Sequence, residues 1–197
     1  LPLARHYVSE SRWADALPLL DLLVKRANKR QPAEQHELWF SLGRAATETG
    51  DDEKALKAFT TANSLDPQHL PSLQGVAGAY YRTKDWEKAF KFYQMLLVHH
   101  RDALGKDDVT DTYYRLGVIK REQGERRKAI NMFDKALEED GHHRPTLEAV
   151  VALYAEQNEW EQVIHFKKQI LDVASEPEQF KLLDEIGDLW REKLKNA

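Results

Sequence analysis

The feature that most constrains this chain is a pattern that recurs every 34 residues, or every 39 to 40 where extra residues are inserted. One column of small residues comprises Ala16, Ala55, Ala89, Ala129 and Val163. An earlier column in each unit comprises Gly43, Ala77, Gly117, Val151 and Gly187. Periods of 20 to 50 residues are typical of chains built from stacked supersecondary units, in which each unit packs only on its neighbours.

Each unit contains two apolar-periodic stretches separated by a short polar turn. In 36–49 the apolar residues Leu38 and Leu42 follow helical spacing, and in 52–65 Ala55 and Phe59 do the same. Gly50-Asp51 between them predicts a helix stop followed by an N-cap. The same signal is expected at Lys84-Asp85, Gly124-Glu125 and Asn158-Glu159. The units are therefore predicted to be helical hairpins, with glycines admitting a closely packed neighbouring helix at Gly43, Gly117 and Gly187.

Composition agrees with a folded chain that has a polar surface. Hydrophobic residues make up 42% and charged residues 31%, and the formal net charge is -4. No apolar run approaches the ~18 residues of a membrane span, and the acidic balance argues against nucleic-acid binding. The absence of cysteine excludes disulfides, thiolate catalysis and cysteine-ligated zinc. The compartment stays open, with the cytoplasm favoured over a periplasmic or membrane-tethered location.

The columns resemble the tetratricopeptide repeat. Unit 36–69 carries Trp39, Leu42, Gly43, Ala55, Phe59, Ala62 and Pro67 at that family's spacing, and other units repeat subsets of the pattern. The resemblance implies an all-α, right-handed superhelical solenoid of about five repeats plus partial ends. A single domain over 1–197, expected to be a fragment of a longer chain, would comprise units 1–30 (partial), 36–69, 70–103, 110–143, 144–179 and 180–197 (first helix only). Extra residues near 30–34 and 104–109 are expected to extend a helix or loop at one rim.

No motif for catalysis is present. The chain has no Gly-rich phosphate loop, no His-Glu-x-x-His and no Gly-x-Ser-x-Gly. The adjacent pairs His99-His100 and His142-His143 diverge on a helix, and the acidic residues near Asp108 lack the spacing of a calcium loop. We expect no enzyme activity, no cofactor and no metal.

The resemblance implies that first helices line a concave groove where peptides bind. The inward positions of the first three full units supply the predicted partner-binding residues Phe40, Arg44, Tyr81, Arg82, Tyr114, Arg115 and Arg121. The C-terminal inward positions are acidic: Glu148, Glu156, Asp184, Glu185 and Asp188. Phe40, Tyr81 and Tyr114 lie off the packing columns and are interpreted as anchors, while Gly75, Gly78, Ala149 and Ala152 leave room for a ligand backbone.

The predicted partner is thus a protein or peptide with acidic character, because arginine forks bind carboxylates bidentately. The alternative is an ordinary solvated surface. In that case Arg44 pairs with Glu48, and Arg115 with Asp111, each four residues away on its own helix.

The final helix presents an apolar stripe of Phe180, Leu183, Trp190 and Leu194. Leu182 and Leu189 widen it and are predicted to form an end-packing interface for a partner or a second copy. The overall interpretation is a non-enzymatic interaction scaffold. Two alternatives stay open: a regulatory or substrate-presenting arm of a larger enzyme, and a module that self-associates through its C-terminal helix.

Overall fold

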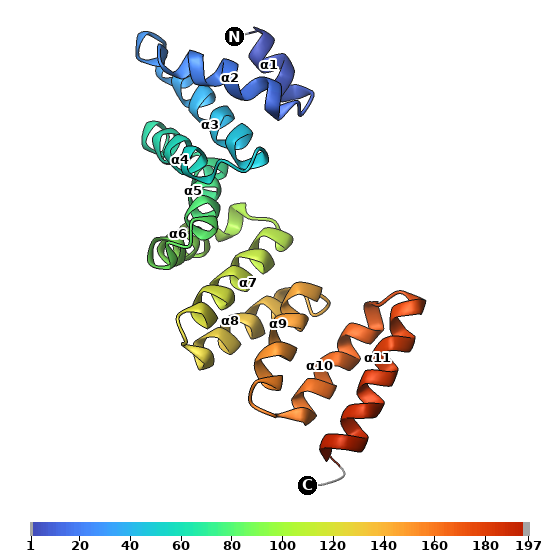
Figure 1. The fold of residues 1–197 in the computed structure, drawn as a ribbon. Helices are drawn as coiled ribbons and strands as arrows, with labels where there is room; N and C mark the ends of the chain where they lie inside the picture. The colour runs from blue at the N-terminus through green and yellow to red at the C-terminus, as the bar shows by residue number, and fades with distance from the viewer. Residues whose placement is uncertain (1, 195–197) are drawn as a thin grey trace. The chain divides into compact units, whose positions relative to one another are not determined.

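The computed structural model describes residues 2–194, which are helical throughout and contain no strand (Figure 1). This confirms the predicted all-α class. The α-helices are α1 (Pro2–Ser9), α2 (Trp13–Val24), α3 (Pro32–Glu48), α4 (Asp52–Leu65), α5 (Leu70–Arg82), α6 (Trp86–His99), α7 (Lys106–Glu122), α8 (Arg126–Glu139), α9 (Arg144–Ala155), α10 (Trp160–Val173) and α11 (Glu176–Leu189). Two 3₁₀ turns, Ala27–Lys29 and Arg101–Ala103, precede α3 and α7, and a π-helical turn, Trp190–Leu194, follows α11.

The helices form two compact units, Leu1–His100 and Arg101–Ala197. The first contains α1 to α6 and the second contains α7 to α11. The boundary lies beside the insertion predicted at 104–109. A single continuous domain across both units stays a prediction.

Both insertions lengthen a first helix. α3 and α7 have 17 residues each, whereas α5 and α9, which lack an insertion, have 13 and 12. Two acidic residues of the second insertion, Asp107 and Asp108, belong to α7. Gly105 is the N-cap of α7 and both aspartates lie in its first turn, where negative charge interacts favourably with the helix dipole.

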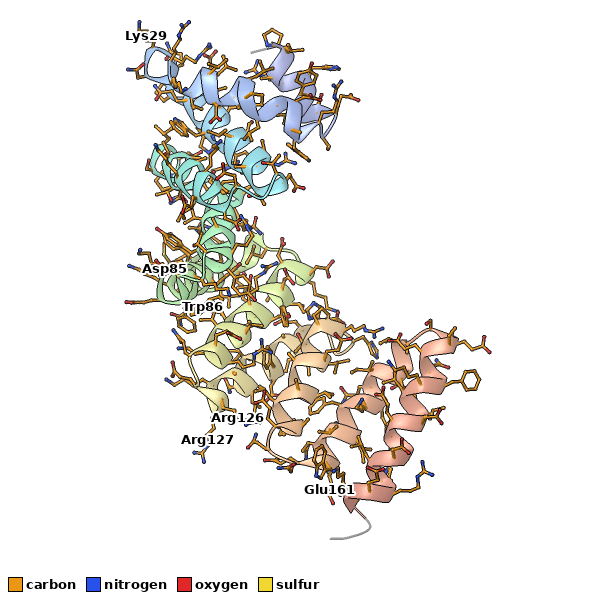
Figure 2. The ribbon with its side chains drawn as sticks, viewed as in Figure 1. Lys29, Asp85, Trp86, Arg126, Arg127 and Glu161 are labelled. Atoms are coloured by element: carbon orange, nitrogen blue, oxygen red, sulfur yellow. The ribbon has the colours of Figure 1, made fainter. Side chains whose placement is uncertain are left out.

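The turn inside each hairpin contains one residue with left-handed backbone. These residues are Ser11, Gly50, Lys84, Gly124 and Asn158, with φ between 54° and 78°. The predicted helix stops are therefore confirmed, although only two of the five are glycine. Figure 2 labels residues that follow two of these turns, Asp85 and Trp86 at the start of α6 and Arg126 and Arg127 at the start of α8.

Capping differs between these turns. Asp51 accepts from the backbone N–H of Lys54 at 3.0 Å, and Asp85 from that of Lys88 at 3.2 Å. Glu125 and Glu159 occupy the equivalent position but make no side-chain cap. All four residues stand at the predicted N-cap position. The side chains of the two glutamates leave the backbone uncapped, because aspartate is among the side chains preferred at this position and the longer glutamate is not.

Aromatic rings, rather than a helix backbone, occupy the space that two of the column glycines leave. A Cβ on Gly43 would lie 2.7 Å from the Phe59 ring, and one on Gly117 would lie 2.4 Å from the Phe133 ring. Gly75 faces Phe59 as well, at 2.5 Å, so its space is filled by protein and is not room for a ligand. A Cβ on Gly187 would meet nothing within 4 Å among the described residues, so no close neighbour there accounts for a glycine.

Candidate partner-binding surface

In the first unit, Phe40 on α3 packs within the protein. Its ring is half-buried, with ring centroids 4.9 Å from His69 and 5.9 Å from Phe59. It therefore supports the aromatic cluster around Phe59, which corrects the view that an off-column ring here has no packing role. A partner can contact only its exposed edge.

Arg44, one turn further along α3, is exposed, and its guanidinium lies 4.7 Å from the ring centroid of Trp13 on α2. The predicted alternative of an Arg44–Glu48 ion pair does not form, and Arg44 makes no ion pair with any residue in 2–194. It lines a hollow of about 430 Å³ together with Glu37 and Ser41 of α3 and residues of α1 and α2. Glu37 itself accepts two hydrogen bonds from Arg5, at 2.7 and 2.6 Å.

Tyr81 and Arg82 end α5. Tyr81 packs edge-on against Trp86 and Tyr93, with centroid separations of 5.5 and 6.2 Å. Arg82 donates to Asp52 Oδ1 at 2.6 Å and to Thr47 Oγ1 at 3.0 Å. This arginine therefore ties α5 to the preceding hairpin, and an acidic ligand would have to compete with Asp52 for it.

In the second unit the three predicted residues all lie on α7. Tyr114 packs against Phe133 and His143, with centroids 6.1 and 5.6 Å apart. Arg115 donates to Asp111 Oδ2 at 3.2 and 2.9 Å, as the alternative interpretation predicted. Arg121 donates to Glu122 at 3.2 Å.

The structure thus brings the predicted residues together within each unit. α3 carries Phe40 and Arg44 and contacts α5, which carries Tyr81 and Arg82. α7 carries Tyr114, Arg115 and Arg121. One groove that joins both sets stays a prediction.

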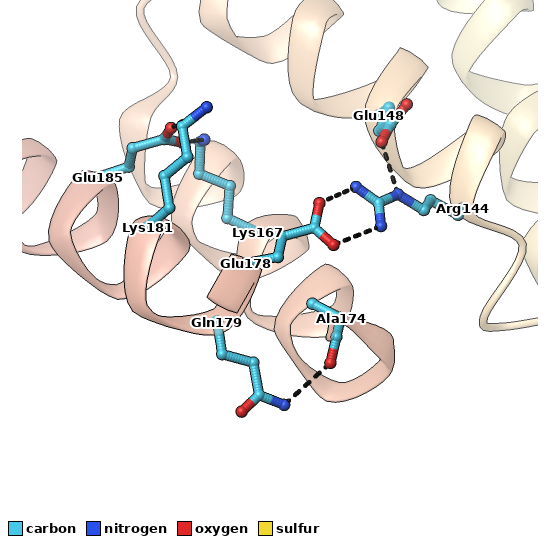
Figure 3. A network of polar contacts seen from close by, with 8 residues as sticks. All are labelled: Arg144, Glu148, Lys167, Ala174, Glu178, Gln179, Lys181 and Glu185. Atoms are coloured by element: carbon cyan, nitrogen blue, oxygen red, sulfur yellow. Dashed lines mark hydrogen bonds and ion pairs between the residues drawn. The ribbon is translucent and has the colours of Figure 1, made fainter. Parts of the chain in front are cut away.

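The acidic C-terminal positions are mostly neutralised by nearby cations (Figure 3). Arg144 of α9 donates to both carboxylate oxygens of Glu178 on α11 and to Glu148 at 2.8 Å. The hydrogen bonds from Arg144 hold the pKa of Glu178 below its usual value. Lys167 pairs with Glu185 at 2.5 Å.

Two further acidic residues of that set also have cationic neighbours. Asp188 pairs with Arg191, and Glu156 lies 3.8 Å from Arg126. Only Asp184 lacks an ion pair within 2–194. The face is therefore less acidic than its residue types suggest.

A polar cluster that sequence reasoning missed lies between the N-terminal ends of α3 and α5. Ser72, fully buried, has its hydroxyl 3.1 Å from His36 Nε2 and 2.8 Å from His69 Nδ1. His69 also caps α5, because its Nδ1 accepts from the Ser72 N–H at 3.3 Å. Burial and the neighbouring His36 lower the pKa of His69. His143 and Thr146 make the same side-chain contact, at 2.7 Å, in the second unit. The recurrence of a histidine followed three residues later by a hydroxyl residue, 74 residues apart, is the sequence signal that could have revealed the cluster.

The end of the chain differs from expectation. Leu182 is buried at 8% exposure in a cluster with Leu147 and Ile170, and Leu189 is half-buried. Leu182 therefore belongs to the core, because α11 packs on α10 through this side. The exposed large apolar side chains of α11 and of the described turn after it are Phe180 at 66%, Leu183 at 51% and Trp190 at 49%.

Among residues 2–194, no helix is long and apolar enough to cross a bilayer. In the same range, no three His, Cys, Asp or Glu side chains are grouped to hold a metal ion.

Comparison with known proteins identifies the family. Profiles described as "Tetratricopeptide repeat" match residues 1–69 and 70–138. The chain belongs to the tetratricopeptide repeat family. Repeats of this family form protein-interaction scaffolds, usually without enzyme activity, and membership supports that general role here.

Solved tetratricopeptide repeat structures share the fold. The MamA RS-1 ArsTM double mutant has a TM-score of 0.72 at 16% identity, over 87% of this chain and 90% of that one. A tetratricopeptide repeat protein from Parabacteroides merdae ATCC 43184 has a TM-score of 0.71 at 19% identity, over 96% and 70%. MamA 41-end from Desulfovibrio magneticus RS-1 gives 0.67 at 15%, over 96% and 92%. No curated protein matches the chain.

Proposed function

We propose that this chain is a non-enzymatic interaction module that binds an acidic segment of a partner protein, and that Arg44 is its principal contact. The observation that supports this is the hollow of about 430 Å³ on the first-helix side of the first unit. The predicted binding residue Arg44 lines it, together with Glu37 and Ser41 of the same helix.

The state of Arg44 sets it apart from the other predicted arginines. Arg82, Arg115 and Arg121 already donate to carboxylates of their own chain. Arg44 has no such partner within 2–194, and the Trp13 ring lies under its guanidinium. A guanidinium that stacks on a ring keeps its N–H donors, which lie in the plane of the guanidinium, available for a bidentate carboxylate.

The test is a charge reversal with a matched control. Short acidic peptides selected for binding to the wild-type chain are titrated into Arg44→Glu and Lys91→Glu by fluorescence anisotropy. Lys91 is exposed on α6, a second helix of the same unit, and takes the same change of charge. Arg44→Glu should weaken binding tenfold or more, roughly the effect of one charged hydrogen bond.

Lys91→Glu should leave the affinity within about twofold. Arg44→Lys keeps the charge but loses the planar fork, so intermediate affinity is expected. Equal affinity for wild type and Arg44→Glu would refute the role of Arg44, and equal losses in both reversals would reduce the effect to net charge.

A second candidate, self-association through the last helix, is favoured by the exposed Phe180, Leu183 and Trp190. Phe180 and Leu183 lie about one turn apart on α11, and Trp190 begins the π-helical turn that follows it. Clustered exposed apolar side chains mark interaction surfaces. Phe180→Ser with Trp190→Ser should lower the sedimentation-derived mass at high protein concentration, whereas Leu22→Ser, at an exposed leucine of the first unit, should not. A wild-type chain that stays monomeric at every concentration excludes this candidate.

A further inference from the structure

A second and larger hollow lies on the second-helix side of the first unit. Its volume is about 620 Å³, and its walls come from α2, α3 and the beginning of α4. It shares no lining residue with the hollow at Arg44. Its size falls within the range typical of small-molecule sites, about 300–1,000 Å³.

The apolar part of the hollow is formed by Val24, Trp39 and Leu42. Trp39 is half-buried, and its indole N–H has no hydrogen-bond partner within 2–194. Leu73 takes the equivalent position 34 residues later and is only 2% exposed. The first unit therefore has a partly uncovered aromatic surface, with a free N–H donor, where the next repeat has a buried leucine.

Some of the charged side chains around the hollow form ion pairs and others do not. Lys54 bridges α4 to α2, with its Nζ 3.0 Å from Asp21 and 3.2 Å from Asp51, so both carboxylates already have a cation. The side chains of Lys25 and Lys57 make no ion pair or hydrogen bond within 2–194, and the same holds for the side chain of Glu53. The uncommitted side chains thus carry two positive charges and one negative charge.

We propose that this hollow binds a small amphipathic acid. An aromatic or aliphatic body would pack on Trp39 and Val24, and its carboxylate would meet the ammonium groups of Lys25 and Lys57. The apolar wall supplies contact area, while the long lysine side chains reach a carboxylate at the mouth. Excess uncommitted positive charge favours an acid over an amine or a neutral molecule of the same shape. The site is independent of the proposed partner surface.

The probe is 1-naphthylacetate, titrated by calorimetry and by ligand-observed NMR. For a ligand of this size a Kd of about 1 mM or lower is expected. The neutral analogue 2-(1-naphthyl)ethanol should bind at least about fivefold more weakly, because it lacks the charge. The matched variants are Lys57→Ala and Lys91→Ala, since Lys91 takes the position of Lys57 34 residues later. Lys57→Ala should weaken binding about three- to tenfold and Lys91→Ala should not.

A second variant tests the apolar wall without threatening the fold. Trp39→Leu installs the residue that the next repeat already has at this position, and should abolish saturable binding while the helical circular dichroism is retained. Arg44→Glu should leave 1-naphthylacetate binding unchanged, which keeps this test separate from that of the proposed function. The proposal is overturned if the probe does not bind, if Trp39→Leu and Lys57→Ala bind it as well as wild type, or if the neutral analogue binds equally well.

Discussion

Two glycines of the same repeat column should respond oppositely to alanine. Gly117 on α7 and Gly187 on α11 both belong to the second unit and both lie within a helix. A Cβ at 117 would lie 2.4 and 2.5 Å from two ring carbons of Phe133, which is fully buried. A Cβ at 187 would have nothing within 4 Å in the part of the chain that the structure describes.

The size of the difference follows from two opposing contributions. Alanine is favoured over glycine in a helix by up to about 1 kcal/mol, and this gain applies at both positions. Forcing an extra methyl group into a packed core costs about 1–3 kcal/mol, and this applies only at Gly117. Gly187→Ala should therefore stabilise the chain by up to about 1 kcal/mol, and the two variants should differ by about 1–3 kcal/mol because the helix contribution largely cancels.

The assay is urea unfolding followed by far-ultraviolet circular dichroism. With a denaturant dependence of about 2 kcal/mol/M, the two midpoints should lie about 0.5–1.5 M apart, with Gly187→Ala the higher. Phe133→Leu, combined with Gly117→Ala, should cost less than the sum of the single changes because the smaller side chain relieves the contact. Coincident midpoints for the two alanine variants would refute the reasoning.

Three other predictions concern polar contacts. The pKa of His69 is lowered in the folded chain, so its contribution to stability is complete above the unfolded pKa of about 6.5 and declines as pH falls below that value. His69→Asn keeps a cap acceptor and should make the melting temperature fall less steeply with pH below that value. A slope equal to that of the wild type would contradict the role given to His69. Asp85→Ala should lower the free energy of unfolding by about 1 kcal/mol, because it removes a helix cap. Glu159→Ala, at an equivalent position without a side-chain cap, should change the urea midpoint little. Equal losses of stability in the two variants would contradict the capping difference. Arg82→Ala should lower the free energy of unfolding by about 0.5–1 kcal/mol. This loss should be smaller in high salt, since the ion pair with Asp52 is partly exposed. A loss that does not depend on salt would indicate that Arg82 stabilises the chain through packing instead.

Much of the fold could be predicted from the sequence because each signal is repeated in phase. Lys84 is a weak helix stop on its own, but its position 34 residues after Gly50 identified it, and its φ of 58° agrees. The side-chain partners could not be predicted in this way. The alternative interpretation paired Arg44 with Glu48 four residues along its own helix, whereas the structure stacks it on Trp13 of another helix.

The C-terminal face shows a second limit. Leu182 and Leu183 are adjacent, so they point about 100° apart on a helix. Which of the two becomes core depends on how α11 rotates against α10, and the apolar pattern there was broad enough to suit either choice. The structure buries Leu182 and exposes Leu183.

The ring of Phe59 has a consequence for how the first unit comes apart. It occupies the space above Gly43 of its own hairpin and also that above Gly75 of the next hairpin. In stacked-repeat proteins the stability of each repeat and the coupling between neighbours are usually separable quantities. Here one side chain contributes to both, so α5 and α6 cannot detach without uncovering the interior of the α3–α4 hairpin. Fraying from that side is therefore opposed at this junction, and these two hairpins should melt as one cooperative block.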